Sequence, residues 1–261
     1  MRVKNDDLVN IIKETVSHAH KYGQILTMDQ LETRLISPIA WEREEIRKVA
    51  LKEKIKLKTG NGKNREARRK TEFVRQIFRK KFIEVVPIEM VAVTGSVAAG
   101  NPKSNDDIDL LVVARANRMW LVRPLITIWL RLMGVGVRRA GSKEKKDDFC
   151  LNLWLEDGYL LIPKSKQTLQ SAIDMVNMVV IYDKNNVREK MTNINFWAKS
   201  FLATGIRKIA EKQSKSLIFS SNFILDGLNT LAFVCQYQWM RDKITSEVVG
   251  KHQAFYHPDR I

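Results

Sequence analysis

Cysteine is scarce in this chain of 261 residues, which contains only Cys150 and Cys235. Both lie in apolar segments, and two such residues do not form the disulfide framework of a small secreted domain. The N-terminus is charged and has no apolar stretch of the kind that a secretory leader contains. Hydrophobic residues make up 44% of the chain, which is ample for a buried core. We therefore expect a cytoplasmic protein of one to two domains.

Long hydrophobic runs are also missing. The most apolar stretch, residues 119–137, is interrupted by Arg123, Pro124 and Arg131. A membrane-spanning helix needs about 20 consecutive, predominantly apolar residues with few or no charges. This stretch is better explained as a helix that joins two strands of a sheet, and no membrane partner is expected.

Acidic residues are outnumbered by basic ones, with 29 Asp and Glu against 45 Lys and Arg, and the formal net charge is +16. Most of the excess is local. Residues 43–81 alone contain 16 Lys and Arg against 5 Asp and Glu, a local net charge of +11. Such a concentration of positive charge favours an anionic partner.

Residues 64–83 have the periodicity of an amphipathic helix. The apolar stripe consists of Ala67, Val74, Ile77, Phe78 and Phe82. The opposite face carries the cations Arg65, Arg68, Arg69, Arg75, Arg79 and Lys80. A basic surface attracts a phosphate backbone through counterion release, so we predict that these six residues bind nucleic acid. The alternatives are a solvated face that keeps the protein soluble and contact with an anionic membrane, although the apolar stripe is needed to cover the sheet.

Two short segments carry the most specific signal. Residues 91–96 read VAVTGS and predict a strand followed by a glycine turn, and residues 107–114 read DIDLLVVA and predict a second strand. Because side chains alternate along a strand, Asp107 and Asp109 point the same way, about 7 Å apart. Ile108 points into the core. Two carboxylates placed in this way can share divalent cations.

The glycine turn and the acidic pair are suited to different parts of a nucleoside triphosphate. Gly95 lets the backbone approach a phosphate, and the amides from Ser96 onward donate to it if they open a helix. Mg²⁺ prefers oxygen ligands and binds one or two carboxylates together with substrate phosphates. Two ions activate the attacking hydroxyl and stabilise the leaving pyrophosphate. The pattern predicts nucleotidyl transfer, with an NTP as substrate and Mg²⁺ or Mn²⁺ as cofactor.

Gly95-Ser96, a short helix and turn, and Asp107-Ile108-Asp109 together resemble the DNA polymerase beta-like nucleotidyltransferase superfamily. The resemblance covers roughly residues 88–162. The two halves of the motif are uninformative alone and specific only in combination at this separation. The resemblance implies an α+β fold with a mixed β-sheet core flanked by helices. The bacterial CCA-adding pattern is absent, since Arg138-Arg139 is followed by Ala140 rather than by an acid.

The resemblance also implies a third carboxylate on a neighbouring strand, which we expect at residues 149–155. On that strand Cys150, Asn152 and Trp154 are expected to share one face with Asp148. Asp148 is our candidate for the third catalytic acid and metal ligand. Asn152 stands where an acid is expected, so it is also consistent with altered metal binding or none.

The chain divides into three expected parts. Residues 1–63 form an N-terminal helical region, with helices over 6–22, 28–37 and 38–56 and N-caps at Thr27 and Ser37. Residues 64–163 form the catalytic core, led by the basic helix and containing a hairpin of residues 149–155 and 159–163. Residues 164–261 form a C-terminal helical domain. In the superfamily such a region closes over the nucleotide. The resemblance therefore implies that Lys199 and Ser200 contact the triphosphate. The alternative is that both side chains are simply exposed to solvent on a helix surface.

These patterns predict a metal-dependent transferase that moves a nucleoside monophosphate from an NTP to a hydroxyl. Asp107, Asp109 and Asp148 are the expected catalytic residues and metal ligands, and Gly95 and Ser96 the expected phosphate-binding residues. The basic charge favours the 3′ end of RNA as acceptor. Two alternatives stay open: an antibiotic-modifying or protein-AMPylating transferase, and an RNA-binding protein that keeps the fold without the chemistry.

Overall fold

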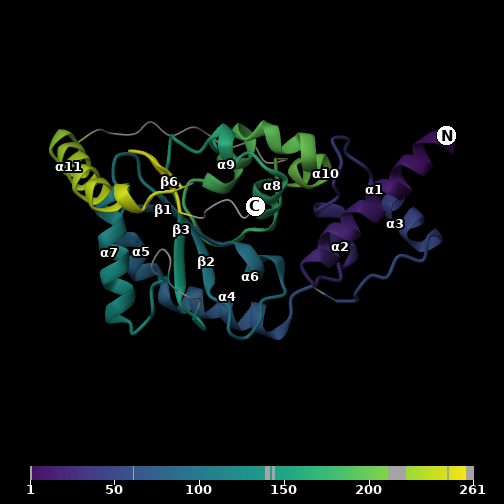
Figure 1. Cartoon of the computed structure of the whole chain (residues 1–261), viewed down its shortest axis with the longest axis horizontal. Helices are drawn as coiled ribbons and strands as arrows, with labels where there is room; N and C mark the ends of the chain where they lie inside the picture. Colours follow the sequence, from purple (N-terminus) through teal and green to yellow (C-terminus); the bar gives the residue numbers. More distant parts are fainter. Residues whose placement is uncertain are drawn as a thin grey trace.

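A six-stranded mixed sheet forms the centre of the computed structural model, with the order β4-β1-β2-β3-β6-β5 (Figure 1). The structure describes residues 2–60, 62–138, 142, 145–210, 222–245 and 247–256. The strands are β1 (Ile88–Val93), β2 (Ile108–Ala114), β3 (Phe149–Glu156), β4 (Val179–Asp183), β5 (Val248–Val249) and β6 (Gln253–Phe255). The expected mixed α/β core flanked by helices is confirmed.

The pairing of the central strands explains the long helix of the core. Strand β1 runs antiparallel to both β2 and β4, whereas β2 and β3 are parallel. Parallel neighbours need a crossover connection. Helix α7 (Met119–Leu132) supplies it and buries Trp120 and Ile126 against the sheet. The prediction that this apolar stretch joins two strands is therefore confirmed, and no described helix is long and apolar enough to cross a bilayer.

Helices cover both faces of the sheet (Figure 1). One face packs against α4 (Arg65–Ile77), α5 (Lys80–Val85), α7 and α11 (Phe223–Met240). The other packs against α8 (Leu169–Asn177), α9 (Val187–Ile194) and α10 (Lys199–Ala210). Short 3₁₀ helices lie at Lys164–Lys166, Phe196–Ala198 and Arg241–Lys243. Helix α11 leaves apolar side chains exposed, among them Phe223, Leu231 and Trp239.

The N-terminal helical region has its own core. It consists of α1 (Arg2–Lys21), α2 (Met28–Thr33) and α3 (Arg43–Lys52), and it buries apolar residues that include Leu8, Leu31 and Trp41. Thr27 caps α2 as expected, through a capping box with Gln30. Ser37 is not an N-cap, because α3 begins later and is capped by Glu42. Backbone pairing of Ser37 with residues of α10 holds this region against the core.

Three expectations about secondary structure are wrong. Residues 159–163 are not a strand, so the expected hairpin does not form, and β3 pairs with β6 instead. Strands β4, β5 and β6 lie in the segment expected to be helical; they are two to five residues long, too short to give a clear periodic pattern. The helix expected over 64–83 ends at Ile77 and restarts at Lys80 as α5.

Candidate active site

The two acids of the motif project from the start of β2 onto the same side. Asp107 immediately precedes the strand and is buried, and Asp109 is half-buried within it. Together with Cys150 of β3 they form a group whose ligand atoms all lie within 4.8 Å of one another. The predicted side-by-side arrangement of Asp107 and Asp109 is therefore present in the fold.

The glycine turn meets these acids directly. Helix α6 (Gly95–Ala99) starts where β1 ends, and Gly95 has a left-handed φ of +62°. A Cβ at Gly95 would lie 2.2 Å from Oδ2 of Asp109. Only glycine satisfies both conditions, because other residues rarely adopt this φ and none has space for its side chain. The first turn of α6 therefore lies against the carboxylate of Asp109.

Both carboxylates are held by side chains from the neighbouring strand and the segment before it. Nη1 of Arg138 donates to Oδ2 of Asp107 at 2.7 Å, and Nδ2 of Asn152 donates to Oδ1 of Asp109 at 2.9 Å. These contacts orient the acids and partly offset their mutual repulsion. Arg138 was not a predicted site residue, because its place in the sequence, in the connection between α7 and β3, gives no sign that it reaches β2.

Asp148 does not join the acidic group. A Cβ built on Gly136 would lie 1.9 Å from Oδ1 of Asp148, so this carboxylate packs against Gly136 instead. The positions beside Asp109 belong to Cys150 and Asn152.

The expectation that Trp154 shares a face with Asn152 is wrong. The register between β2 and β3 shifts by one residue between the pairs of Asp109 and Leu111. A shift of this kind turns the residues that follow it to the other face. Trp154 therefore packs in the core beneath α7, whereas Leu153 follows Asn152 on the site face.

The donor atoms of this site fit a divalent cation that prefers oxygen. Oδ1 of Asn152 is buried and has no hydrogen-bond partner among the described residues, which is costly for a polar atom. Burial and the carboxylates of Asp109 and Asp107 raise the pKa of the Cys150 thiol. Carboxylate and amide oxygens bind Mg²⁺ or Mn²⁺, whereas thiolates select softer ions. The oxygen atoms of Asp107, Asp109 and Asn152 therefore fit a divalent cation.

A cavity of about 770 Å³ opens beside these groups. Its wall includes the turn at Gly95 and Ser96, both motif acids and Lys103, together with His18 of α1 and Tyr22, which follows that helix. This volume is within the usual range for small-molecule sites. The N-terminal region thus forms one wall of the cavity, which the sequence did not suggest.

Lys199 and Ser200 do not line this cavity. Nζ of Lys199 lies 4.9 Å from the ring centroid of Phe196, and Oγ of Ser200 donates to the carbonyl of Trp197 at 2.6 Å. The structure places both at the start of α10.

Two of the six cations predicted to bind nucleic acid, Arg69 and Arg75, form ion pairs with acids. Arg69 donates to Asp147 through both terminal nitrogens and also pairs with Glu66, and these hydrogen bonds raise the pKa of its guanidinium. Nη1 of Arg75 lies 3.4 Å from Oε2 of Glu72. Three cations, Arg65, Arg68 and Arg79, are exposed. The side chain of Lys80 lies outside the described residues.

Lys70 was not predicted as a functional residue, yet it is completely buried and connects α4 to the site. Its Nζ donates to Oδ1 of Asp147 at 2.8 Å and to the carbonyl of Asp106 at 2.6 Å. Asp106 precedes the first motif acid and accepts hydrogen bonds from Ser96 and Lys103. Lys70 therefore fixes the loop that leads into Asp107.

The far end of α6 is held by the N-terminal region. The carbonyl of Ala99 accepts hydrogen bonds from Gln24, Gln30 and Arg34 at 2.8, 3.2 and 2.9 Å. Burial lowers the pKa of Arg34 to about 10, so its guanidinium stays charged at neutral pH. A cation at the C-terminal end of a helix is favourable. The helix that begins at Gly95 is thus fixed at its C-terminal end.

Comparison with known proteins identifies the central part of the chain. Residues 74–194 match the model of the nucleotidyltransferase domain family, and this segment runs from the end of α4 to the end of α9. A search among curated proteins finds no match. The matched segment contains the glycine turn, the motif acids and strands β1 to β4. Residues 74–194 are therefore a nucleotidyltransferase domain of the DNA polymerase beta-like type.

Proposed function

We propose that this protein transfers a nucleoside monophosphate from an NTP to the 3′-terminal hydroxyl of an RNA, with Mg²⁺ or Mn²⁺ as cofactor. One observation carries the proposal: Asp107 and Asp109 lie side by side against the first turn of α6, at the edge of the cavity. An arrangement of this kind puts carboxylate oxygens and backbone N–H donors around one triphosphate.

Each residue of the site has a distinct role in this proposal. Gly95 and Ser96 bind the phosphates, and Asp107 and Asp109 hold the divalent cations. A bound cation neutralises charge on the phosphates and favours the loss of the hydroxyl proton. Arg138 positions Asp107, and Asn152 positions Asp109 and offers Oδ1 at the third ligand position. In this proposal Asn152 supplies a neutral oxygen ligand at the position that we expected Asp148 to occupy as an acid.

The choice of RNA rests on charge. Arg65 and Arg68 are exposed on α4, and Arg79 is exposed at the start of α5. Lys70 of α4 contacts the loop before Asp107. An anionic strand that leads into the site would lie beside these side chains. Neither an antibiotic nor a protein acceptor requires such a face, because neither carries a regular phosphate backbone.

The test is incorporation of label from each α-³²P-NTP into short RNAs in the presence of Mg²⁺ or Mn²⁺. The wild-type protein is expected to extend an RNA. The Asp107→Asn and Asp109→Asn variants are expected to extend none. Asp242→Asn is the matched control, because Asp242 is exposed and lies near the end of α11, on a different element from the site. Extension by the two site variants at the wild-type rate would contradict the proposal.

The same assay separates the two remaining alternatives. A small-molecule or protein transferase would label an aminoglycoside or a protein, would ignore RNA and would show weak dependence on salt. An RNA-binding protein without catalytic activity would bind RNA with a steep salt dependence and extend none. Asn152 at the position of the third acid is the observation that favours this second alternative.

A further inference from the structure

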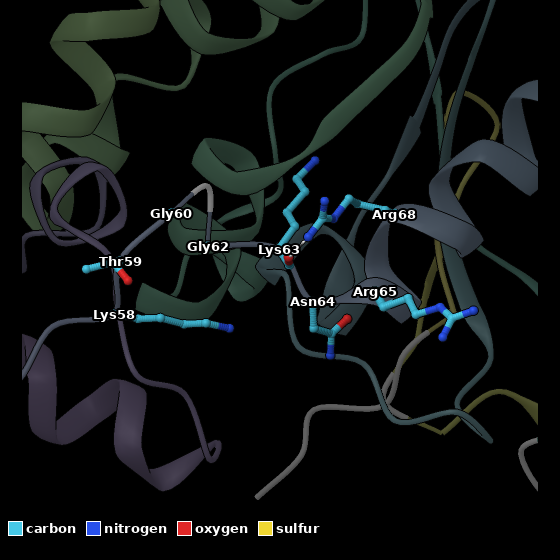
Figure 2. Close-up of a pocket in the computed structure, with 8 residues that line it drawn as sticks. All are labelled: Lys58, Thr59, Gly60, Gly62, Lys63, Asn64, Arg65 and Arg68. Atoms are coloured by element: carbon cyan, nitrogen blue, oxygen red, sulfur yellow. Dashed lines mark hydrogen bonds between the residues drawn. The ribbon is translucent and has the colours of Figure 1, made fainter.

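A second polar centre lies at the opposite end of α6 from the acids. It is a pocket of about 560 Å³ between the linker that follows the N-terminal region and the start of α4 (Figure 2). The described residues that line it are Lys58, Thr59, Gly60, Gly62, Lys63, Asn64, Arg65 and Arg68. Four of these are cations and none is an acid. We call it the basic pocket.

The cations approach the basic pocket from both of its sides. Figure 2 shows Lys58 extending from the linker on one side and Arg68 from α4 on the other, with Lys63 between them. Lys58 and Arg68 are exposed, and no described acid pairs with either. Burial lowers the pKa of the half-buried Lys63. An anion in the pocket would offset the positive charge of Lys58 and Arg68.

Backbone N–H groups also favour an anion in the basic pocket. Asn64 caps α4 by accepting a hydrogen bond from the N–H of Ala67 at 2.7 Å. The N–H groups of Arg65 and Glu66, in the first turn of the helix, have no partner within it. They lie at the positive end of a helix of 13 residues, beside the four cations. Side-chain and backbone donors therefore converge on one pocket.

A short strip of chain connects the basic pocket to the active-site cavity. Asn101 and Lys103 line the cavity, whereas the carbonyl of Pro102, between them, accepts a hydrogen bond from Nδ2 of Asn64. The N–H of Asn64 also donates to the carbonyl of Gly100 at 2.9 Å. Residues 100–103 therefore link a lining residue of the basic pocket to the wall of the cavity.

We infer that the basic pocket binds a backbone phosphate of the RNA acceptor, a few nucleotides before its 3′ end; this rests on the proposed function. Four cations, with no acid among the described lining residues, favour a phosphate, and the strip that connects the pocket to the cavity is consistent with one strand that reaches both. The pocket contacts phosphate rather than bases, so it sets the position of the acceptor without reading its sequence.

The experiment compares the double variant Lys58→Ala/Arg68→Ala with wild type and with Arg47→Ala/Lys48→Ala, which removes the same charge from exposed positions of α3. Fluorescence anisotropy measures the affinity of each protein for a labelled 12-nucleotide RNA across salt concentrations, without NTP or metal. The pocket variant is expected to bind about tenfold more weakly, with a salt slope lower by about 1. The control variant should change the affinity by less than about threefold. Thermal melts confirm that all three are folded.

A second arm distinguishes RNA phosphate from a free phosphate ligand, with inorganic phosphate as the probe in thermal-shift measurements. If the pocket variant loses stabilisation by inorganic phosphate while RNA affinity is unchanged, the inference is overturned. Equal affinity and slope in the wild type and the pocket variant also overturn it, as does a wild-type protein that does not bind RNA.

Failure of the proposed function gives a different result. RNA that binds through the basic pocket but is never extended would overturn the proposed transfer and leave only the binding of RNA phosphate at the pocket standing. RNA that is extended with the same KM by the wild type and the pocket variant would overturn the inference alone.

Discussion

The two ends of α6 differ in charge and in how that charge is compensated. At its start, Gly95 lies against the carboxylate of Asp109, and the acids there are paired with Arg138 and Asn152. At its end, Gly100 lies against the linker, beside a pocket that has four cations and no described acid. The acidic end is positioned to hold cations and reacting phosphates, whereas the basic end is suited to an anion that arrives from outside. A helix of five residues thus separates the proposed chemistry from the proposed acceptor contact.

The largest expected effect comes from the acidic end. Asp109→Asn, or Asp107→Asn, should lower the rate of nucleotidyl transfer by on the order of 10³-fold, because the stabilisation of charge by the cations amounts to several kcal/mol. Single-turnover kinetics at saturating RNA measure the change. The affinity of these variants for RNA should be unchanged. A variant that keeps the wild-type transfer rate but loses RNA binding would reverse the roles assigned to the two ends of α6.

Gly95→Ala is expected to have the next largest effect. A Cβ there would lie 2.2 Å from Oδ2 of Asp109 and would displace the carboxylate, so the rate should fall by about 10²-fold. Gly23→Ala is the matched control: its φ of +67° is similar, and nothing lies within 4 Å of the added Cβ. Equal losses of activity in both variants would show that the contact with Asp109 is unimportant.

Gly100→Ala tests the basic end. A Cβ there would lie 2.6 Å from the carbonyl oxygen of Gly62, and the φ of +96° is unfavourable for alanine. We expect a loss of about 2 kcal/mol in the free energy of unfolding and a higher KM for RNA, with little change in kcat. Denaturant unfolding and steady-state kinetics measure these. Gly158→Ala, with a φ of +102° and open space around it, should leave KM unaltered.

Asn152→Asp tests the third ligand position. The new carboxylate would lie beside Oδ1 of Asp109, which the amide now contacts at 2.9 Å. Repulsion should lower the Tm without metal, and Mg²⁺ should bind about tenfold more tightly, because its ligand set gains an anionic oxygen. Mg²⁺ titrations followed by Tm measure both effects. Unchanged Mg²⁺ affinity would place Asn152 outside the metal site.

The smallest expected effect concerns the connection of α4 to the site. Burial alone would raise the pKa of Asp147, but hydrogen bonds from Arg69 and Lys70 outweigh it and lower the pKa below its ordinary value. A carboxyl group whose pKa is lowered by folding stabilises the folded state at pH values above its unfolded-state pKa of about 3.9. This stabilisation is lost as the pH falls through the pKa of the folded state. Asp147→Asn should therefore cost about 1 kcal/mol at pH 7 and progressively less below pH 4. A loss that is constant between pH 7 and pH 3 would contradict this origin.

The sequence was informative where one local pattern determined the geometry. Residues 91–96 and 107–114 predicted two strands, a glycine turn and an acidic pair on one side, and the fold contains each of them. Alternation along one strand needs no knowledge of its neighbour. The amphipathic face of α4 was predictable for the same reason.

Features that depend on pairing between distant segments could not be predicted. The face on which Trp154 lies depends on the register shift between β2 and β3, and the contact of Asp148 with Gly136 depends on how the segment before β3 folds. Lys70 looked like one more cation of a basic run, although it is completely buried. Long-range contacts of this kind have no periodic signature in the sequence.

Binding of Mn²⁺ together with a non-hydrolysable NTP, followed by electron paramagnetic resonance, tests the central claim most directly. The wild-type protein should bind Mn²⁺ more tightly when the nucleotide is present, and both Asp107→Asn and Asp109→Asn should lose that gain while Asp242→Asn retains it. Equal binding of Mn²⁺ and nucleotide by all four proteins would contradict the assignment of these two acids, beside the turn at Gly95, as the metal-binding centre.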